Sequence, residues 1–197
     1  DISSISENIA RRLRKFISSE YDINATIHVI SVDQLTCEEF VRSMITPSPC
    51  CSFSWHEGAG IFQMDPDVFF HSFLNSGAIK KNRDLNGLEK LIFEQFLYTP
   101  IMKTIYEEFS KAAQKELVPI SNHKYDPYII FSLSSLSPAE MGVTIAFCVK
   151  IGKNEGTMNF FLNADCLKSL RNTMFFSTNG ESSFVPPPWP RQLSHHI

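Results

Sequence analysis

The chain has 197 residues, a length that suits one domain, since a single hydrophobic core commonly serves about 100 to 200 residues. Apolar residues make up 43% and charged residues 20%, and 17 phenylalanines can fill a large aromatic core, so most of the chain is not disordered. The formal net charge of −3 leaves no broad cationic face for phosphates, so nucleic acid is not an expected partner.

Cysteine content and hydropathy indicate the cellular compartment of the protein and whether it enters a membrane. The five cysteines are odd in number and irregularly spaced, unlike the disulfide framework of a small secreted domain, so we expect a reducing compartment. No stretch approaches the roughly 20 apolar residues of a membrane-spanning helix. The chain starts at Asp1, without a basic region followed by an apolar one. The sequence therefore predicts a cytoplasmic protein with no membrane insertion.

The first two predicted elements are a helix and a strand. Residues 2–17 carry apolar side chains at helical spacing, with basic residues on the other faces. Ser4 and Glu7 have the Ser-x-x-Glu spacing of a capping box, which would place a helix start there. Residues 23–29 alternate between apolar and polar side chains, as expected of a half-buried strand.

A short helix and a hairpin follow. Thr36 and Glu39 repeat the capping-box spacing at the start of the short helix. Residues 51–64 alternate in two runs, and we expect Gly58 and Gly60 to allow the turn between them.

The middle of the chain predicts two helices separated by a loop. Asp65 followed by proline is typical of an N-cap, so a short phenylalanine-rich helix should run to about Leu74. The polar residues 75–86 form the loop. The longest helical pattern covers residues 88–112, and Pro100 should kink or divide it because proline removes a hydrogen bond and crowds the preceding turn.

The last third is mostly strands. Residues 128–136 and 141–151 predict two strands, and the second shows the clearest alternation in the chain. Residues 158–162 return as a third strand, and Asn163 can cap a short helix. The segment 177–197 contains four prolines and predicts a tail or linker, leaving residues 1–176 as the domain.

The second half of this order repeats the first. A strand running into a cap occurs at Gly60–Asp65 and again at Gly156–Asn163, offset by roughly 96 to 98 residues. An unrelated α+β chain could give the same echo. We favour duplication, which predicts an α+β fold with pseudo-twofold symmetry, one continuous antiparallel sheet, two long helices and short flanking helices.

Catalytic and metal-binding patterns are weak in this sequence. Cys50, Cys51 and His56 are the nearest approach to zinc-ligand spacing, but Cys51 alternates with Phe53 and Trp55 and should face the core as a small hydrophobe. No nucleophile elbow or phosphate-binding glycine loop is present. We therefore expect no metal site, no cofactor and no catalytic residues.

Three segments resemble a known family. The chain is similar to the middle domain of the flagellar motor switch protein FliM, which belongs to the CheC, CheX and FliY group. The resemblance covers roughly residues 5–172, and it is carried by the following segments: Asn8–Arg14, Val32–Met44 and Met64–Pro66. It implies a pseudo-twofold α+β fold, in agreement with the repeat.

The resemblance also bears on enzyme activity. CheC and CheX dephosphorylate the response regulator CheY with an Asp/Ser-x3-Glu-x2-Asn motif on paired helices, where an acid and an amide hold the attacking water. Here the first helix offers Ser3, Glu7 and then Ala10, and the long helix offers Lys90, Glu94 and then Leu97. The amide is missing from both, so we expect a binding and scaffold protein that is not an enzyme.

Two surfaces are candidates for partner binding. In FliM a Gly-Gly-x-Gly loop after the Met-Asp-Pro helix contacts the rotor protein FliG, and the matching region here is Asn75, Ser76, Gly77 and Ala78. Only one glycine is retained, so FliG binding is in question or the interface is altered. Arg11, Arg12 and Arg14 on the first helix are candidates for contacts between neighbouring copies.

The resemblance implies a role in bacterial motility and chemotaxis. We expect a structural and signalling component of the C-ring at the flagellar basal body, on the inner face of the cell membrane. Its partners would be the FliG middle domain, neighbouring FliM copies and CheY-phosphate, the last mainly through an amino-terminal peptide not visible in this sequence. The alternatives are a CheY-phosphate phosphatase and a divergent adaptor outside the motor.

Overall fold

The computed structural model describes residues 1–74, 83–129 and 136–178. Within them, the helices and strands alternate along the chain in two similar series, and η1 and η2 are π-helical. The elements are α1 (Ile2–Glu20), β1 (Ala25–Thr36), α2 (Cys37–Ser43), β2 (Cys50–Trp55), β3 (Gly58–Met64), α3 (Pro66–Val68), η1 (Phe69–Phe73), α4 (Gly87–Ile92), η2 (Phe93–Tyr98), α5 (Thr99–Ala113), β4 (Ser121–Tyr125), β5 (Met141–Ile151), β6 (Asn154–Asn163) and α7 (Ala164–Thr178).

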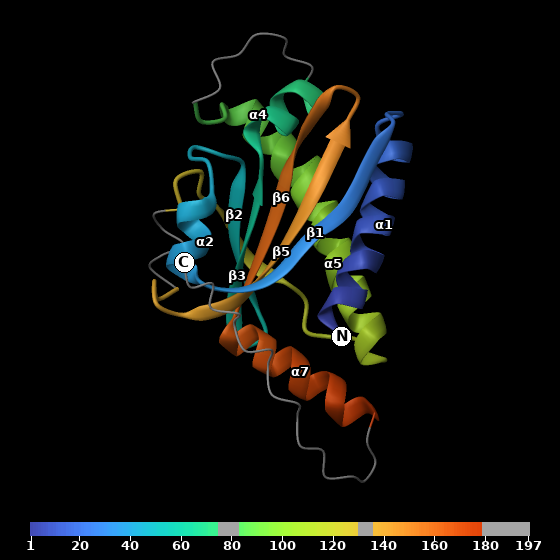
Figure 1. Cartoon of the computed structure of the whole chain (residues 1–197), viewed down its shortest axis with the longest axis vertical. Coiled ribbons are helices and arrows are strands. Elements are labelled where there is room, and N and C mark those ends of the chain that lie inside the picture. The colour runs from blue at the N-terminus through green and yellow to red at the C-terminus, as the bar shows by residue number, and fades with distance from the viewer. Residues whose placement is uncertain (75–82, 130–135, 179–197) are drawn as a thin grey trace, which may run out of the picture.

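The strands of the described residues form one antiparallel sheet in the order β1-β5-β6-β3-β2-β4. Figure 1 shows α5 passing behind this sheet and α1 alongside it, and the two helices contact one another. The α+β fold with a continuous antiparallel sheet and two long helices is therefore confirmed.

The sheet register locates the pseudo-twofold axis. Phe62 of β3 lies opposite Phe160 of β6, and the two numbers differ by 98. The N-caps Asp65 and Asn163 also differ by 98 residues. Phe62 and Phe160 are therefore equivalent positions of the two repeats, and they lie opposite one another in the sheet. The two halves also exchange strands, since β1 joins the β5–β6 hairpin and β4 joins the β2–β3 hairpin. The predicted duplication is thus built into one sheet.

Two glycines occupy equivalent places in this arrangement. A Cβ on Gly58 would lie 2.2 Å from the backbone nitrogen of Cys166 and 2.3 Å from Oδ1 of Asn163. A Cβ on Gly156 would lie 2.5 Å from Cγ2 of Val68 and 2.8 Å from a carboxylate oxygen of Asp65. Each glycine therefore lets a strand of one half approach the capped helix start of the other half.

The prediction that Gly58 and Gly60 form the hairpin turn is wrong. Gly58 and Gly60 lie in β3, paired with Trp55 and Phe53, and the turn itself contains His56, whose φ is 54°. Position 60 requires glycine because an added Cβ would lie 2.3 Å from the ring of Phe53. Close packing, and not turn geometry, explains both glycines.

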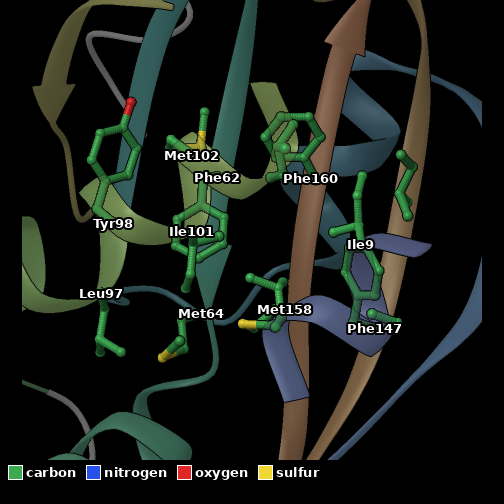
Figure 2. Packing of buried hydrophobic residues seen from close by; sticks show 14 of the residues in the cluster. Ile9, Phe62, Met64, Leu97, Tyr98, Ile101, Met102, Phe147, Met158 and Phe160 are labelled. Carbon is green, nitrogen blue, oxygen red and sulfur yellow. The ribbon is translucent and has the colours of Figure 1, made fainter. Parts of the chain in front are cut away.

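The main core lies between the sheet and helices α1 and α5. Figure 2 shows side chains of α1, η2 and α5 meeting those of β3, β5 and β6, with the central pair Phe62 and Phe160 on the sheet side. The rings of Phe53 and Phe160 stack with centroids 5.4 Å apart, and Trp55 packs edge-on against Phe109 at 5.2 Å. The phenylalanine-rich composition is thus used for packing.

A smaller core lies on the other face of the sheet, under α2. Phe40 of α2 stacks on Phe161 of β6 with ring centroids 5.1 Å apart, and Cys37 and Cys50 are buried beside them. The predicted capping box at Thr36 and Glu39 is present and fixes the start of α2. The Glu39 carboxylate accepts hydrogen bonds from the backbone N–H and the side chain of Thr36. These bonds lower the pKa of Glu39, and the backbone N–H makes the larger contribution.

Several local predictions need correction. Helix α1 begins at Ile2 with Asp1 as its N-cap, so the capping box at Ser4 and Glu7 is wrong. β4 was not predicted from the sequence because its short polar run, Ser121–Tyr125, lacks an apolar alternation. Helix α7 continues to Thr178, beyond the expected start of the tail.

Two predictions fall mostly on residues that the structure does not describe. The strand expected at 128–136 covers residues 130–135, which are not described, while Tyr128 lies in a turn. The tail at 177–197 is described only at its first two residues, which belong to α7. The boundary between residues 176 and 177 stays a prediction.

Candidate partner-binding surface

The predicted FliG-facing residues Asn75, Ser76, Gly77 and Ala78 lie outside the described residues. The described segments on either side of them are η1, which precedes them, and Arg83 with α4, which follow. Contacts anchor both segments, and these segments form a surface from residues that the structure does describe.

Arg83 fastens the segment that leads into α4. Its guanidinium donates two hydrogen bonds to the carboxylate of Glu89, at 2.8 and 2.7 Å, and lies 4.8 Å from the ring centroid of Phe70. Glu89 also accepts from the backbone N–H of Asn86, whose side chain accepts from the backbone N–H of Glu89 in return. The hydrogen bond from Arg83 is the main cause that lowers the pKa of Glu89. Two parallel hydrogen bonds between an arginine and a carboxylate fix the relative orientation of the two groups.

An exposed apolar strip follows on the same helical segment. Leu88, Leu91 and Phe96 are 67%, 46% and 55% exposed, and we call these three residues the apolar strip. Leu88 and Leu91 are three residues apart, so they are neighbours on one helix face. Phe96 lies about one turn further along, in the π-helical segment η2.

The apolar strip corrects the helix-face assignment made from the sequence. Leu88 and Leu91 begin the apolar pattern that predicts the long helix, but both are exposed. The buried series is instead Phe93, Leu97 and Ile101, which follows the strip around the helix. A second apolar series at helical spacing is the signal in the sequence, but spacing alone does not tell which of the two series faces the core.

A π-helical stretch joins α4 to α5 ahead of Pro100. The backbone N–H and the side-chain hydroxyl of Thr99 both donate to the carbonyl oxygen of Glu94, five residues earlier. Pro100 then lies in the first turn of α5, where a missing N–H is tolerated. Helical residues run without a gap from Gly87 to Ala113, so Pro100 does not divide the helix, and the irregularity takes the form of a widened turn ahead of it.

The three arginines predicted for self-association separate into two groups. Arg12 points at α5, where it donates to a carboxylate oxygen of Glu108 at 3.0 Å and also pairs with Glu107. These carboxylates raise the pKa of Arg12, the hydrogen bond to Glu107 being the largest cause. Arg11 is exposed and bonds Asn8 on its own helix, and Arg14 is also exposed. The arginines at positions 11 and 14 thus remain accessible.

On neither helix is the asparagine position of the phosphatase motif open to solvent. Ala10 and Leu97, which stand where the motif has asparagine, are 2% and 1% exposed and belong to the main core. Glu94 lies 3.6 Å from Nε2 of His123. Because the amide positions point into packed apolar surroundings, neither helix presents an acid and an amide together to solvent.

The cysteines are buried free thiols. Burial is the main cause that raises the pKa of Cys37 to about 11 and that of Cys166 to about 12, which favours the unreactive thiol form. Among residues 1–74, 83–129 and 136–178, no group of three or more metal-ligating side chains is found. In the same part of the chain, no helix combines the length and the apolar character needed to cross a membrane.

Comparison with known proteins places this chain among flagellar proteins. The family model described as flagellar motor switch protein FliM matches residues 1–178. The chain belongs to the FliM family. It is 34% identical over 170 residues to the flagellar motor switch protein FliM of Borreliella burgdorferi, covering 82% of this chain and 47% of that protein. The chain therefore spans about half the length of the curated FliM relatives it matches.

Solved structures show the same fold. The chain is similar to a chain of the FliG–FliM complex from H. pylori, with a TM-score of 0.74, 23% identity and coverage of 87% of this chain and 95% of that one. It is also similar to the FliM middle domain from H. pylori, with a TM-score of 0.73, 22% identity and the same coverage. The fold expected from the resemblance is confirmed.

Proposed function

We propose that this chain is a non-enzymatic component of the flagellar motor switch that binds the FliG middle domain through residues 75–78 and the apolar strip. The observation that carries the proposal is the strip itself. Three large apolar side chains are exposed on one helical segment, which Arg83 fastens and which follows residues 75–82 in the chain. Large apolar side chains exposed along one helical segment suit a protein–protein contact.

Family membership supports FliG as the occupant. A related FliM from H. pylori is solved in complex with FliG. An apolar strip also suits a protein partner because burying such side chains supplies binding free energy without desolvating charges. Gly77 would let the backbone approach the partner closely.

Family membership supports a wider proposal. We place the protein in the C-ring at the basal body, in the cytoplasm, where copies would stand side by side and relay a CheY-phosphate signal to FliG to set the direction of rotation. Arg11 and Arg14, which are accessible, are the residues we propose for contacts with neighbouring copies. Residues 1–176 would form this domain and residues 177–197 a tail or linker.

Calorimetric titration against the FliG middle domain tests the binding site. Wild type should bind, whereas Leu91→Glu and Phe96→Glu should each weaken affinity by about tenfold or more, because a charge would be buried at the contact. Val118→Glu is the matched control, since Val118 is an equally exposed apolar residue outside the strip, at 56%. Absence of wild-type binding, or equal losses in all three variants, would contradict the proposal.

A phosphate-release assay with CheY-phosphate tests the non-enzymatic part. We expect no acceleration over the spontaneous rate, because the amide positions are occupied by buried Ala10 and Leu97. Release that is accelerated by wild type and lost in Glu94→Ala would establish the phosphatase alternative instead.

A further inference from the structure

Tyr21, the residue that follows α1, reaches across to the interrupted helix. Its hydroxyl donates a hydrogen bond to the carbonyl oxygen of Phe96, with an O–O distance of 2.5 Å, joining residues 75 positions apart. Phe96 is the member of the apolar strip that lies in η2. One end of α1 is therefore tied directly to the backbone of the proposed FliG-binding surface.

The accepting carbonyl lies where helical hydrogen bonding is disturbed. In an α-helix the N–H of residue 100 would donate to the carbonyl of Phe96, four residues earlier, but residue 100 is a proline and has no N–H. The Tyr21 hydroxyl supplies a donor to that carbonyl. A side chain from another element thus completes the backbone of η2 at the point where the sequence interrupts it.

The ring of Tyr21 contacts the other π-helical segment. It packs edge-on against Phe73 of η1 with centroids 5.2 Å apart, and against Phe16 of α1 at 6.2 Å. Tyr21 therefore bridges η1 and η2, the π-helical segments that lie before residues 75–82 and after α4 in the chain. Burial is the main cause that raises the pKa of Tyr21 to about 12, so the hydroxyl keeps its proton at neutral pH and can donate.

We propose that Tyr21 is a positioning residue that couples α1 to the FliG-binding surface by fixing η2 against η1. The proposal rests on the proposed function for its ligand, and on the Tyr21 contacts for its mechanism. Since a coupling free energy between two sites is reciprocal, FliG bound at the strip should in turn restrain the end of α1. Contacts that neighbouring copies make on α1 would then alter FliG affinity through the same residue.

The variant Tyr21→Phe tests this because it keeps the ring and removes only the hydroxyl. In hydrogen–deuterium exchange of the full chain, amides of η2 and the first turn of α5 should exchange about fivefold faster or more than in wild type. The matched control is Tyr106→Phe, whose lost hydroxyl bonds the carbonyl oxygen of Leu117 at 3.0 Å, outside η2. Unchanged exchange in η2 of Tyr21→Phe would overturn the positioning role.

A second measurement separates coupling from a purely structural role. Saturating wild type with the FliG middle domain should slow exchange of the Tyr21 and Ile23 amides, which bond the carbonyls of Ile17 and Ser18 at the end of α1. In Tyr21→Phe that slowing should disappear, and FliG affinity should fall about threefold to tenfold. Equal slowing in both proteins would refute the coupling. If wild type does not bind FliG at all, the proposed function fails and the coupling fails with it, while exchange in free Tyr21→Phe still decides the positioning role.

Discussion

The two long helical segments occupy equivalent places in the two halves but differ in how they are built. Helix α1 is unbroken over 19 residues, and it turns basic side chains outward. At the offset of 98 residues its counterpart is α5, and the apolar strip lies on α4 and η2, which lead into α5 through a π-helical stretch. Both supply buried apolar residues to one core. The comparison teaches that the duplicated helices share their inward packing, whereas the apolar strip belongs to the segment that leads into the second of them.

The largest expected effect is at the symmetry axis. Phe62→Ala and Phe160→Ala should each lower the free energy of unfolding by about 3 to 5 kcal/mol, because each ring is nearly fully buried and leaves a cavity. Chemical denaturation of both variants measures this. If the halves are equivalent at their core, the two losses should agree within about 1 kcal/mol. A much larger difference would break the equivalence.

The two glycine junctions should show a smaller and unequal effect. Gly58→Ala would place its Cβ against the backbone nitrogen of Cys166, whereas Gly156→Ala meets the side chain of Val68 first, which can rotate. We expect a loss of about 1 to 3 kcal/mol for the first and less for the second.

The control for these junctions is Gly87→Ala at the start of α4, where nothing lies within 4 Å of an added Cβ. It should be neutral or stabilising by up to about 1 kcal/mol. Thermal or denaturant unfolding compares the three variants. Equal losses at Gly58 and Gly156 would show that the backbone at Cys166 yields as easily as a side chain.

The smallest expected effect concerns the ion pairs between the two helices. Arg12→Met keeps most of the side-chain stem but leaves Glu108, which is 5% exposed, without its charged donor. We expect a loss of about 1 to 2 kcal/mol in unfolding free energy. Arg11→Met is the control, because Arg11 bonds only Asn8 on its own helix among the described contacts, and it should change stability by less than about 0.5 kcal/mol.

Much of the fold could be predicted because local signals agreed with the final packing. Alternation gave β5 and β6, and the caps at Thr36, Asp65 and Asn163 marked real helix starts. The duplication was visible because strand and cap recur at a fixed offset. These signals depend on neighbouring residues, which a sequence displays directly.

The remaining features depend on contacts between distant residues. β4 forms because β2 offers an edge, and its polar sequence carries no sign of that pairing. The hydroxyl of Tyr21 and the carbonyl of Phe96 meet only in the folded chain, and so do Arg12 and Glu108. For the candidate site, helical spacing could not tell which of two apolar series faces the core, so the apolar strip became apparent only from the structure.

The exchange of strands has a consequence for the order in which the domain can form during synthesis. β1 is complete at Thr36, but its partner β5 begins at Met141, so more than 100 residues must be made before β1 acquires a neighbour in the sheet. Until then β1 exposes unpaired backbone on both edges, which exposes the nascent chain to aggregation. Folding of the first half alone on the ribosome should therefore be incomplete, and release of the second half should trigger collapse of the whole domain in one step.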